Sequence, residues 1–191
     1  MKLHSKSNAF LALVLAIAIA ATGCSPQWIN VALENLPVLT QMALNIATLA
    51  SPPGSAKQAA DAAVIQNISA QASRGLNLLR TLCLDYKANP DAARLLRIQK
   101  AIADLDRNLP TLLESAHISD PKLADRVRVA VNLILTTVNG FAALMPLSQA
   151  AAGQLSGAPP PATDLRERWN GEVCAAGEFP ESPSPECLMR K

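Results

Sequence analysis

Apolar residues recur every three or four positions along most of the chain, the spacing that predicts amphipathic helices. A first stripe comprises Ile29, Leu33, Leu36, Ala43, Ile46 and Ala50. A second comprises Ile65, Ile68, Ala72, Leu79, Leu82 and Tyr86, and its helix should end near Ala88. A third comprises Leu95, Ile98, Ile102, Leu105, Leu109, Leu112 and Ala116, with alternating steps typical of helices packed at shallow angles. A fourth comprises Leu123, Val127, Ala130, Ile134, Val138, Phe141 and Met145.

Capping residues beside prolines indicate where these helices begin. Such combinations occur at Ser25-Pro26, Asn89-Pro90-Asp91 and Asp120-Pro121. Ser55 followed by Gln58 predicts a capping box for the second helix. Pro37 should bend the first helix or, alternatively, that helix is shorter and is capped by Asn35. Pro110 should kink the third helix.

Four amphipathic helices joined by short turns predict an all-α domain over residues 24–150, an antiparallel up-and-down four-helix bundle. The scarcity of aromatic residues, 3% of the chain, predicts a core of Ala, Leu, Ile and Val. Residues 151–191 lose the long stripe and form a Pro/Ala/Gly-rich C-terminal extension, interpreted as a linker and tail. A short helix over 164–175 would place Leu165, Trp169 and Val173 on one side.

The N-terminus has the pattern of a secretory signal. Lys2 and Lys6 precede an uncharged apolar run over residues 9–21, and small residues follow at Thr22-Gly23. The run has about 13 residues, fewer than the ~20 that a transmembrane helix requires. We therefore expect residues 1–23 to be a cleaved signal peptide.

Ala21-Thr22-Gly23-Cys24 resembles the lipobox of bacterial lipoprotein precursors. The resemblance covers residues 1–24 and implies that Cys24 becomes the new N-terminus and carries a diacylglycerol with a further acyl chain, enough for stable membrane attachment. Ser25 follows, whereas in enteric bacteria an Asp at that place retains such proteins at the inner membrane. The resemblance therefore implies the cell envelope and favours the periplasmic face of the outer membrane, with the inner membrane as the alternative.

Removing residues 1–23 changes the charge of the chain. The segment holds two of the 17 basic residues and none of the 15 acidic ones, so the remaining 168 residues have 15 of each and no net charge. Nucleic-acid binding depends on neutralising phosphates with a basic surface. A nucleic-acid partner is therefore not expected.

Glu114-Ser115-Ala116-His117 matches the Glu-x-x-His motif of di-iron carboxylate bundles. Those sites need two such motifs, and His117 is the only histidine after residue 23. We therefore interpret His117 as an exposed residue near a helix C-terminus, where a cation suits the helix dipole. No nucleophile elbow, phosphate-binding glycine loop or Cys-x-x-Cys motif is present, so no metal, cofactor or catalytic residue is expected.

Three cysteines remain besides Cys24, and an oxidising compartment predicts one disulfide among them. Cys174–Cys187 closes the shortest loop and is favoured by loop entropy. The alternative pairs Cys83 with a tail cysteine, and a further alternative makes Cys83 a small buried apolar residue.

Trp28 and two glycines within helices allow two interpretations each. Trp28 either rests at the headgroup level of the membrane or covers one end of the core. Gly75 and Gly140 either allow close approach between helices or have no structural role.

Three functions follow from these features. The first is a lipid-anchored, non-catalytic structural or protein-interaction module that binds another envelope protein. The second is a module that binds an apolar ligand such as a lipid between its helices. The third is an enzyme whose site has no recognisable sequence motif.

Overall fold

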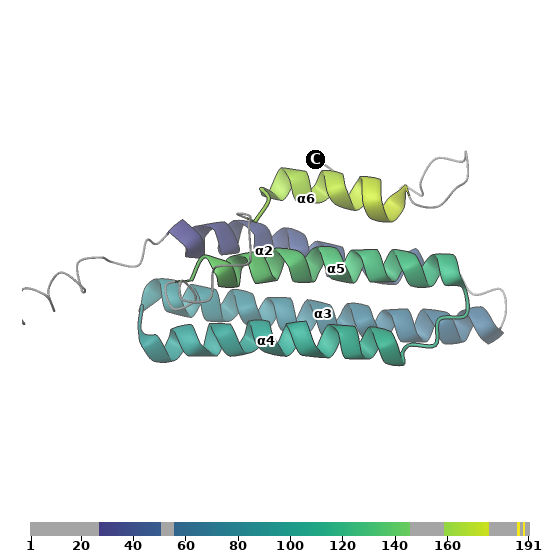
Figure 1. The fold of residues 1–191 in the computed structure, drawn as a ribbon, viewed down its shortest axis with the longest axis horizontal. Coiled ribbons are helices and arrows are strands. Elements are labelled where there is room, and N and C mark those ends of the chain that lie inside the picture. Colours follow the sequence, from purple (N-terminus) through teal and green to yellow (C-terminus); the bar gives the residue numbers. More distant parts are fainter. Residues whose placement is uncertain (1–26, 51–55, 146–158, 176–186, 188, 190–191) are drawn as a thin grey trace, which may run out of the picture.

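The computed structural model describes residues 27–50, 56–145, 159–175, 187 and 189. Five α-helices pack together in this part of the chain, as shown in Figure 1: α2 (Gln27–Ile46), α3 (Ala56–Ala88), α4 (Ala92–Ser115), α5 (Pro121–Ala143) and α6 (Ala162–Arg168). A short 3₁₀ helix, Ala47–Leu49, follows α2, and a π-helical segment, Trp169–Cys174, continues α6. These residues contain no strand, so the all-α prediction is confirmed for them.

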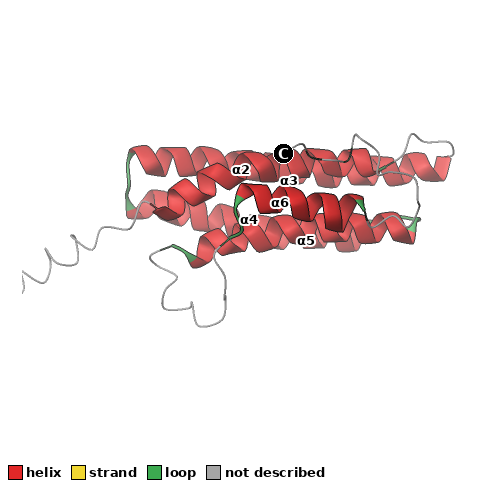
Figure 2. Cartoon of the chain, turned by 90° about the horizontal axis from the view of Figure 1, so that it is seen from above, coloured by secondary structure: helices red, strands yellow, loops and turns green. Residues whose placement is uncertain are grey.

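The four long helices lie side by side, and Figure 2 shows the same arrangement from above. α2 contacts both α3 and α5, and α4 also contacts both α3 and α5. α6 packs on α2, and its π-helical continuation packs on α5. Among the described helices, none has a stretch of sufficient length and hydropathy to cross a membrane.

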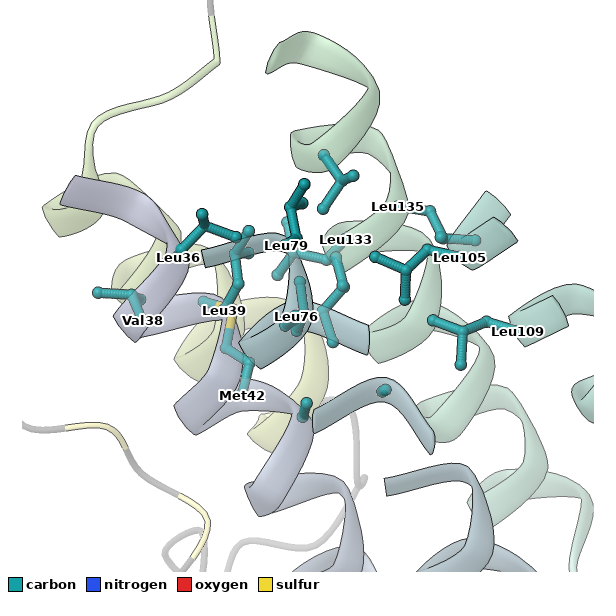
Figure 3. Close-up of a cluster of buried hydrophobic side chains, with 14 of the residues drawn as sticks. Leu36, Val38, Leu39, Met42, Leu76, Leu79, Leu105, Leu109, Leu133 and Leu135 are labelled. Atoms are coloured by element: carbon teal, nitrogen blue, oxygen red, sulfur yellow. The ribbon is translucent and has the colours of Figure 1, made fainter. Parts of the chain in front are cut away.

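The predicted stripes form one continuous core. Leu36, Leu39 and Met42 from α2 lie in the same cluster as Leu76 and Leu79 from α3, all five without exposed surface (Figure 3). Every position of the second stripe is buried, and the third and fourth stripes are buried except at their outer ends. The partly buried exceptions are Leu33, Ala50, Leu112, Ala116 and Leu123. The hydrophobic pattern therefore identified most of the core.

The structure decides two helix boundaries that the sequence left open. α2 is continuous from Gln27 through Pro37 to Ile46, so the shorter helix capped by Asn35 is wrong. Asn35 is instead buried, and its Nδ2 donates to the carbonyl of Val31, 2.9 Å away. The N-cap of α4 is Asp91, not Asn89, because the Asp91 carboxylate accepts from the backbone N–H of Arg94.

Two further boundary predictions have different outcomes. Asp120 caps α5 as expected, accepting from the N–H groups of Lys122 and Leu123, and Pro121 opens the helix. Ser25, Pro26 and the proposed cap Ser55 lie outside the described residues.

The C-terminal segment contributes to the core, which differs from its interpretation as a tail. Leu165, Trp169 and Val173 have no exposed surface and belong to the same apolar cluster as the long helices. The helix starts two residues before the predicted residue 164. A short stripe that contains one Trp removes enough apolar area from water to hold the segment in place. Residues 146–158 lie outside the described part, so the chain between α5 and Pro159 is not placed.

Candidate functional site

Cys24, the expected lipid attachment site, lies outside the described residues, as do the lipobox and the rest of residues 1–26. The described structure begins three residues later, with the first turn of α2. The attachment therefore remains a prediction from the sequence.

Trp28 packs inside the protein. Its side chain is 4% exposed, and its ring lies 5.5 Å from that of Tyr86 on α3 at an interplanar angle of 44°. This geometry favours the core interpretation of Trp28 over a position at the membrane interface. Its Nε1 donor has no hydrogen-bond partner among the described residues.

A disulfide joins Cys174 to Cys187, the pair with the shortest loop, and encloses a sequence separation of 13 residues. Cys83 is a free, buried thiol, so it is not the partner of either cysteine. Burial raises the pKa of Cys83 to about 12, from an ordinary value of 9.0. Since the thiolate is the reactive form of cysteine, Cys83 is not suited to nucleophilic chemistry at neutral pH.

Hydrogen bonds hold the residues around this disulfide, which we call the C-terminal latch (Trp169–Cys174, Cys187 and Met189). The indole Nε1 of Trp169 donates to the carbonyl of Cys187 at 2.9 Å, inside the protein. The side-chain amide of Asn170 donates to the carbonyl of Met189 at 3.0 Å and accepts from its N–H at 2.9 Å. Polar groups of the latch are thus satisfied by its own residues, as burial requires.

Arg126 of α5 forms hydrogen bonds with the latch. Its Nε donates to the carbonyl of Val173 at 2.9 Å, and its Nη2 lies 3.8 Å from the Sγ of Cys187. Burial lowers the pKa of Arg126 from its ordinary value, and the nearby Asp120 carboxylate opposes that shift. A cation at the C-terminal end of a helical segment also interacts favourably with its free carbonyl groups. Nothing in the sequence around Arg126 indicates a partner 47 residues away, so its role is visible only in the fold.

Asp61 is a second polar residue that sequence analysis missed. Its side chain is 4% exposed, and its carboxylate accepts from the backbone N–H of Ser119 at 2.9 Å. The bond joins α3 to the loop between α4 and α5. A signal was present, since Asp61 precedes Ile65 by four residues and so falls on the apolar stripe of that helix.

His117 and Glu114, the residues of the Glu-x-x-His motif, are both exposed. The His117 Nδ1 lies 3.2 Å from the carbonyl of Ser115, two residues earlier. In the described part of the chain, no three His, Cys, Asp or Glu side chains are arranged to hold a metal ion.

A groove of about 270 Å³ lies between α3 and α4. Gly75, Leu105 and Leu109 contribute to its apolar lining, with Arg74 and Asp104 among its polar residues. A Cβ added at Gly75 would lie 2.4 Å from the Cδ2 of Leu105, so this glycine permits the close approach of the two helices. Small-molecule sites usually enclose about 300–1,000 Å³, so the groove is small for such a ligand.

Gly140 also allows a close approach, but not between two long helices. A Cβ there would lie 3.3 Å from the Cβ of Pro159, the first described residue of the C-terminal segment. Gly140 thus makes room for the chain that leads into α6.

No protein-family model matches the chain, and neither the curated proteins nor the solved structures include a significant match to it.

Proposed function

We propose that the protein is a lipid-anchored envelope protein that acts as a non-catalytic structural or protein-interaction module. Its mature chain attaches to the membrane through Cys24 and binds another envelope protein rather than nucleic acid. The resemblance of residues 21–24 to a lipobox supports the anchor, and the net charge of zero after cleavage argues against a polyanionic partner.

We also propose that α2 to α5 form an antiparallel up-and-down four-helix bundle, which α6 extends. Each of these four helices contacts two of the others, as in a closed bundle. The described connections support the same topology, since residues 89–91 join α3 to α4 and residues 116–120 join α4 to α5. Short connections favour antiparallel neighbours.

The filled core is the observation that carries the proposal of an interaction module. The largest fully buried side chains come from α2, α3, α4, α5 and the latch, and they include Leu36, Met42, Ile98 and Phe141. These side chains belong to one apolar cluster at the centre of the described helices, and the groove of about 270 Å³ between α3 and α4 is small for a ligand, which together argue against an apolar ligand carried there. A domain whose interior holds its own side chains acts through its outer surface.

A fatty-acid labelling experiment tests the anchor. Cells that express the full chain should incorporate labelled palmitate into the protein, and Cys24→Ala should abolish the label and leave the precursor uncleaved. Cys83→Ala is the matched control and should retain the label, because Cys83 is buried in the folded domain. Label that persists in Cys24→Ala would contradict the lipobox interpretation.

Crosslinking in cells, followed by purification, tests the partner. An interaction module should be recovered with a reproducible envelope protein, and recovery of the chain alone would count against this role. Native mass spectrometry of the purified protein should show no bound lipid beyond the covalent one. A co-purifying lipid would instead support the apolar-ligand alternative.

A further inference from the structure

Exposed leucines are concentrated at one end of the molecule. Five large apolar side chains in the described part are exposed: Leu44, Leu78, Leu84, Leu96 and Leu144. Leu84 lies four residues before the end of α3, Leu96 lies four residues after the start of α4, and Leu144 caps α5. Since a helix rises 1.5 Å per residue, Leu84 and Leu96 are each within about 6 Å of the ends of their helices.

This end is also where the chain enters the described structure. The Trp28–Tyr86 ring contact places the start of α2 beside the end of α3, and the 2.9 Å Arg94–Asp85 ion pair places the start of α4 there. Figure 1, coloured along the sequence, shows the last turn of α5 at the same end as the start of α2. We call this region the proximal end; it comprises the start of α2, residues 80–97 and Leu144.

Basic residues are in excess at the proximal end. Residues 80–97 hold Arg80, Lys87, Arg94 and Arg97 against two carboxylates, Asp85 and Asp91, and the start of α2 adds a third carboxylate, Glu34. Arg94 pairs with both aspartates, and the Arg97 guanidinium lies 4.0 Å from Asp85. The loop at the opposite end has the reverse balance, since residues 114–126 hold Glu114, Asp120 and Asp125 against Lys122 and Arg126.

The distance to the lipid is short. Two residues, Ser25 and Pro26, lie between Cys24 and Gln27, and three residue steps of at most about 3.6 Å each place a lipid on Cys24 within roughly 11 Å of α2. A tether this short keeps the proximal end at the membrane surface at a high local concentration, where weak contacts are populated.

We infer that the proximal end is a membrane-docking surface that contacts phospholipid headgroups. Leu84, Leu96 and Leu144 enter the interface between headgroups and acyl chains, while Lys87 and Arg80 extend toward the phosphates. The opposite end, with the α4–α5 loop, points away from the bilayer. This inference rests on the proposed lipid attachment at Cys24 and adds an orientation to it.

Fluorescence quenching in vesicles tests the orientation. The full chain is processed in cells, purified with its lipid and reconstituted into vesicles of phosphatidylethanolamine and phosphatidylglycerol, which include a lipid with a spin-labelled headgroup. A fluorophore is attached to Asn89→Cys at the proximal end or to His117→Cys at the opposite end, both exposed positions. Cys83 is 1% exposed and the tail cysteines are joined, so the introduced thiol is the one that reacts.

We expect quenching at position 89 to exceed quenching at position 117 several-fold. Leu84→Ser with Leu96→Ser should reduce the difference, whereas Leu44→Ser with Leu78→Ser should preserve it. The two pairs are matched, because the first are 46% and 58% exposed and the second 49% and 55%. All four side chains are on the surface, so neither pair should unfold the protein.

Equal quenching at positions 89 and 117 in the unsubstituted protein would overturn the docking surface, as would equal effects of the two serine pairs. Mass spectrometry of the same sample separates this failure from failure of the anchor. A lipidated protein with equal quenching overturns the orientation alone. A protein without lipid overturns both the anchor and the orientation.

Discussion

Ile102 lies in the middle of the buried stripe of α4 and is 4% exposed. Ile102→Asp would place a carboxylate among apolar side chains with no cation to pair with it, which should cost on the order of 3–5 kcal/mol. Because small domains have a total stability of only about 5–15 kcal/mol, we expect a large fall in the urea midpoint. Leu96→Asp, on the exposed side of the same helix, is the control and should change the midpoint little. Similar midpoints for both variants would show that the stripe is not core.

Gly75 weakens the α3 helix, but the packing of Leu105 against it leaves no room for a larger residue. Replacing Gly by Ala within a helix normally adds about 1 kcal/mol of stability, but here the new Cβ would meet Leu105 at 2.4 Å. We expect Gly75→Ala to lower the free energy of unfolding of the natural chain. In a chain that already carries Leu105→Ala, adding Gly75→Ala should instead raise the free energy of unfolding. A double-mutant cycle by urea unfolding measures this coupling. Additive effects would mean that the Leu105 side chain moves aside without cost.

Cys83 should make stability depend on pH in the alkaline range. Its pKa is about 12 in the folded protein against an ordinary 9.0, because burial disfavours the thiolate. Because the pKa is higher in the folded protein than in the unfolded chain, the protonated thiol makes its full contribution to stability below pH 9. That contribution is lost as the pH rises toward 12. One pH unit above 9, the loss should approach about 1.4 kcal/mol. Urea unfolding across this range measures it, and Cys83→Ala should remove the corresponding part of the slope. An unchanged slope would contradict the burial of this thiol.

α6 and the latch pack into the same apolar core as the four long helices. The disulfide closes a short loop, which typically contributes about 3 kcal/mol by restricting the unfolded chain. Arg126, Trp169 and Asn170 then hold Val173, Cys187 and Met189 of the latch in position through five hydrogen bonds. The disulfide limits the freedom of the unfolded segment, while the hydrogen bonds give the folded segment one orientation.

Truncation after Ala150 should therefore destabilise the protein, although the sequence pattern predicted a bundle that folds without its tail. The deletion removes Leu165, Trp169 and Val173, which are fully buried, and each such side chain stabilises by about 1.5–3 kcal/mol. The entropy of ordering the segment offsets part of this, leaving a loss of a few kcal/mol. Urea unfolding and binding of a hydrophobic dye measure the effect. Trp169→Ala should reproduce much of it and Thr163→Ala, at an exposed position of α6, should not. An unchanged midpoint after truncation would restore the original prediction.

Hydrophobic periodicity predicted the long helices, whereas the partners of Asp61 and Arg126 come from parts of the chain that are distant in sequence. The periodicity of α3 identified its buried face, because each buried side chain recurs within one or two turns. The signal Asn89-Pro90-Asp91 predicted the start of α4 without identifying its cap, since Asn89 and Asp91 both flank Pro90 and composition does not distinguish them. Asp61 and Arg126 bond to groups 58 and 47 residues away. Such partners depend on the tertiary fold, which a one-dimensional pattern does not contain.

For the whole molecule, the neutral charge of the mature chain conceals an uneven distribution. The proximal end has four basic and three acidic residues when Glu34 of α2 is counted, and the opposite loop has two basic and three acidic residues over 114–126. Interactions between exposed charges are screened beyond about 8–10 Å at physiological salt. Each end therefore presents its own local charge to its surroundings.

The first turn of α2 determines how closely the domain is held to its lipid. Trp28 and Ile29 are buried at the start of the helix, so the chain should be ordered from Gln27 onward. If residues 25–34 instead formed a flexible tether, its end-to-end distance would be about 15–20 Å, so the average distance to the lipid would hardly distinguish the two arrangements. Backbone motion does distinguish them. Nitroxide labels at Gln27→Cys and Asn30→Cys, both exposed positions, should move as slowly in vesicles as a label at Arg128→Cys within α5. Fast isotropic motion at both positions, with order beginning near Leu36, would contradict direct attachment and would also remove the short tether on which the docking surface depends.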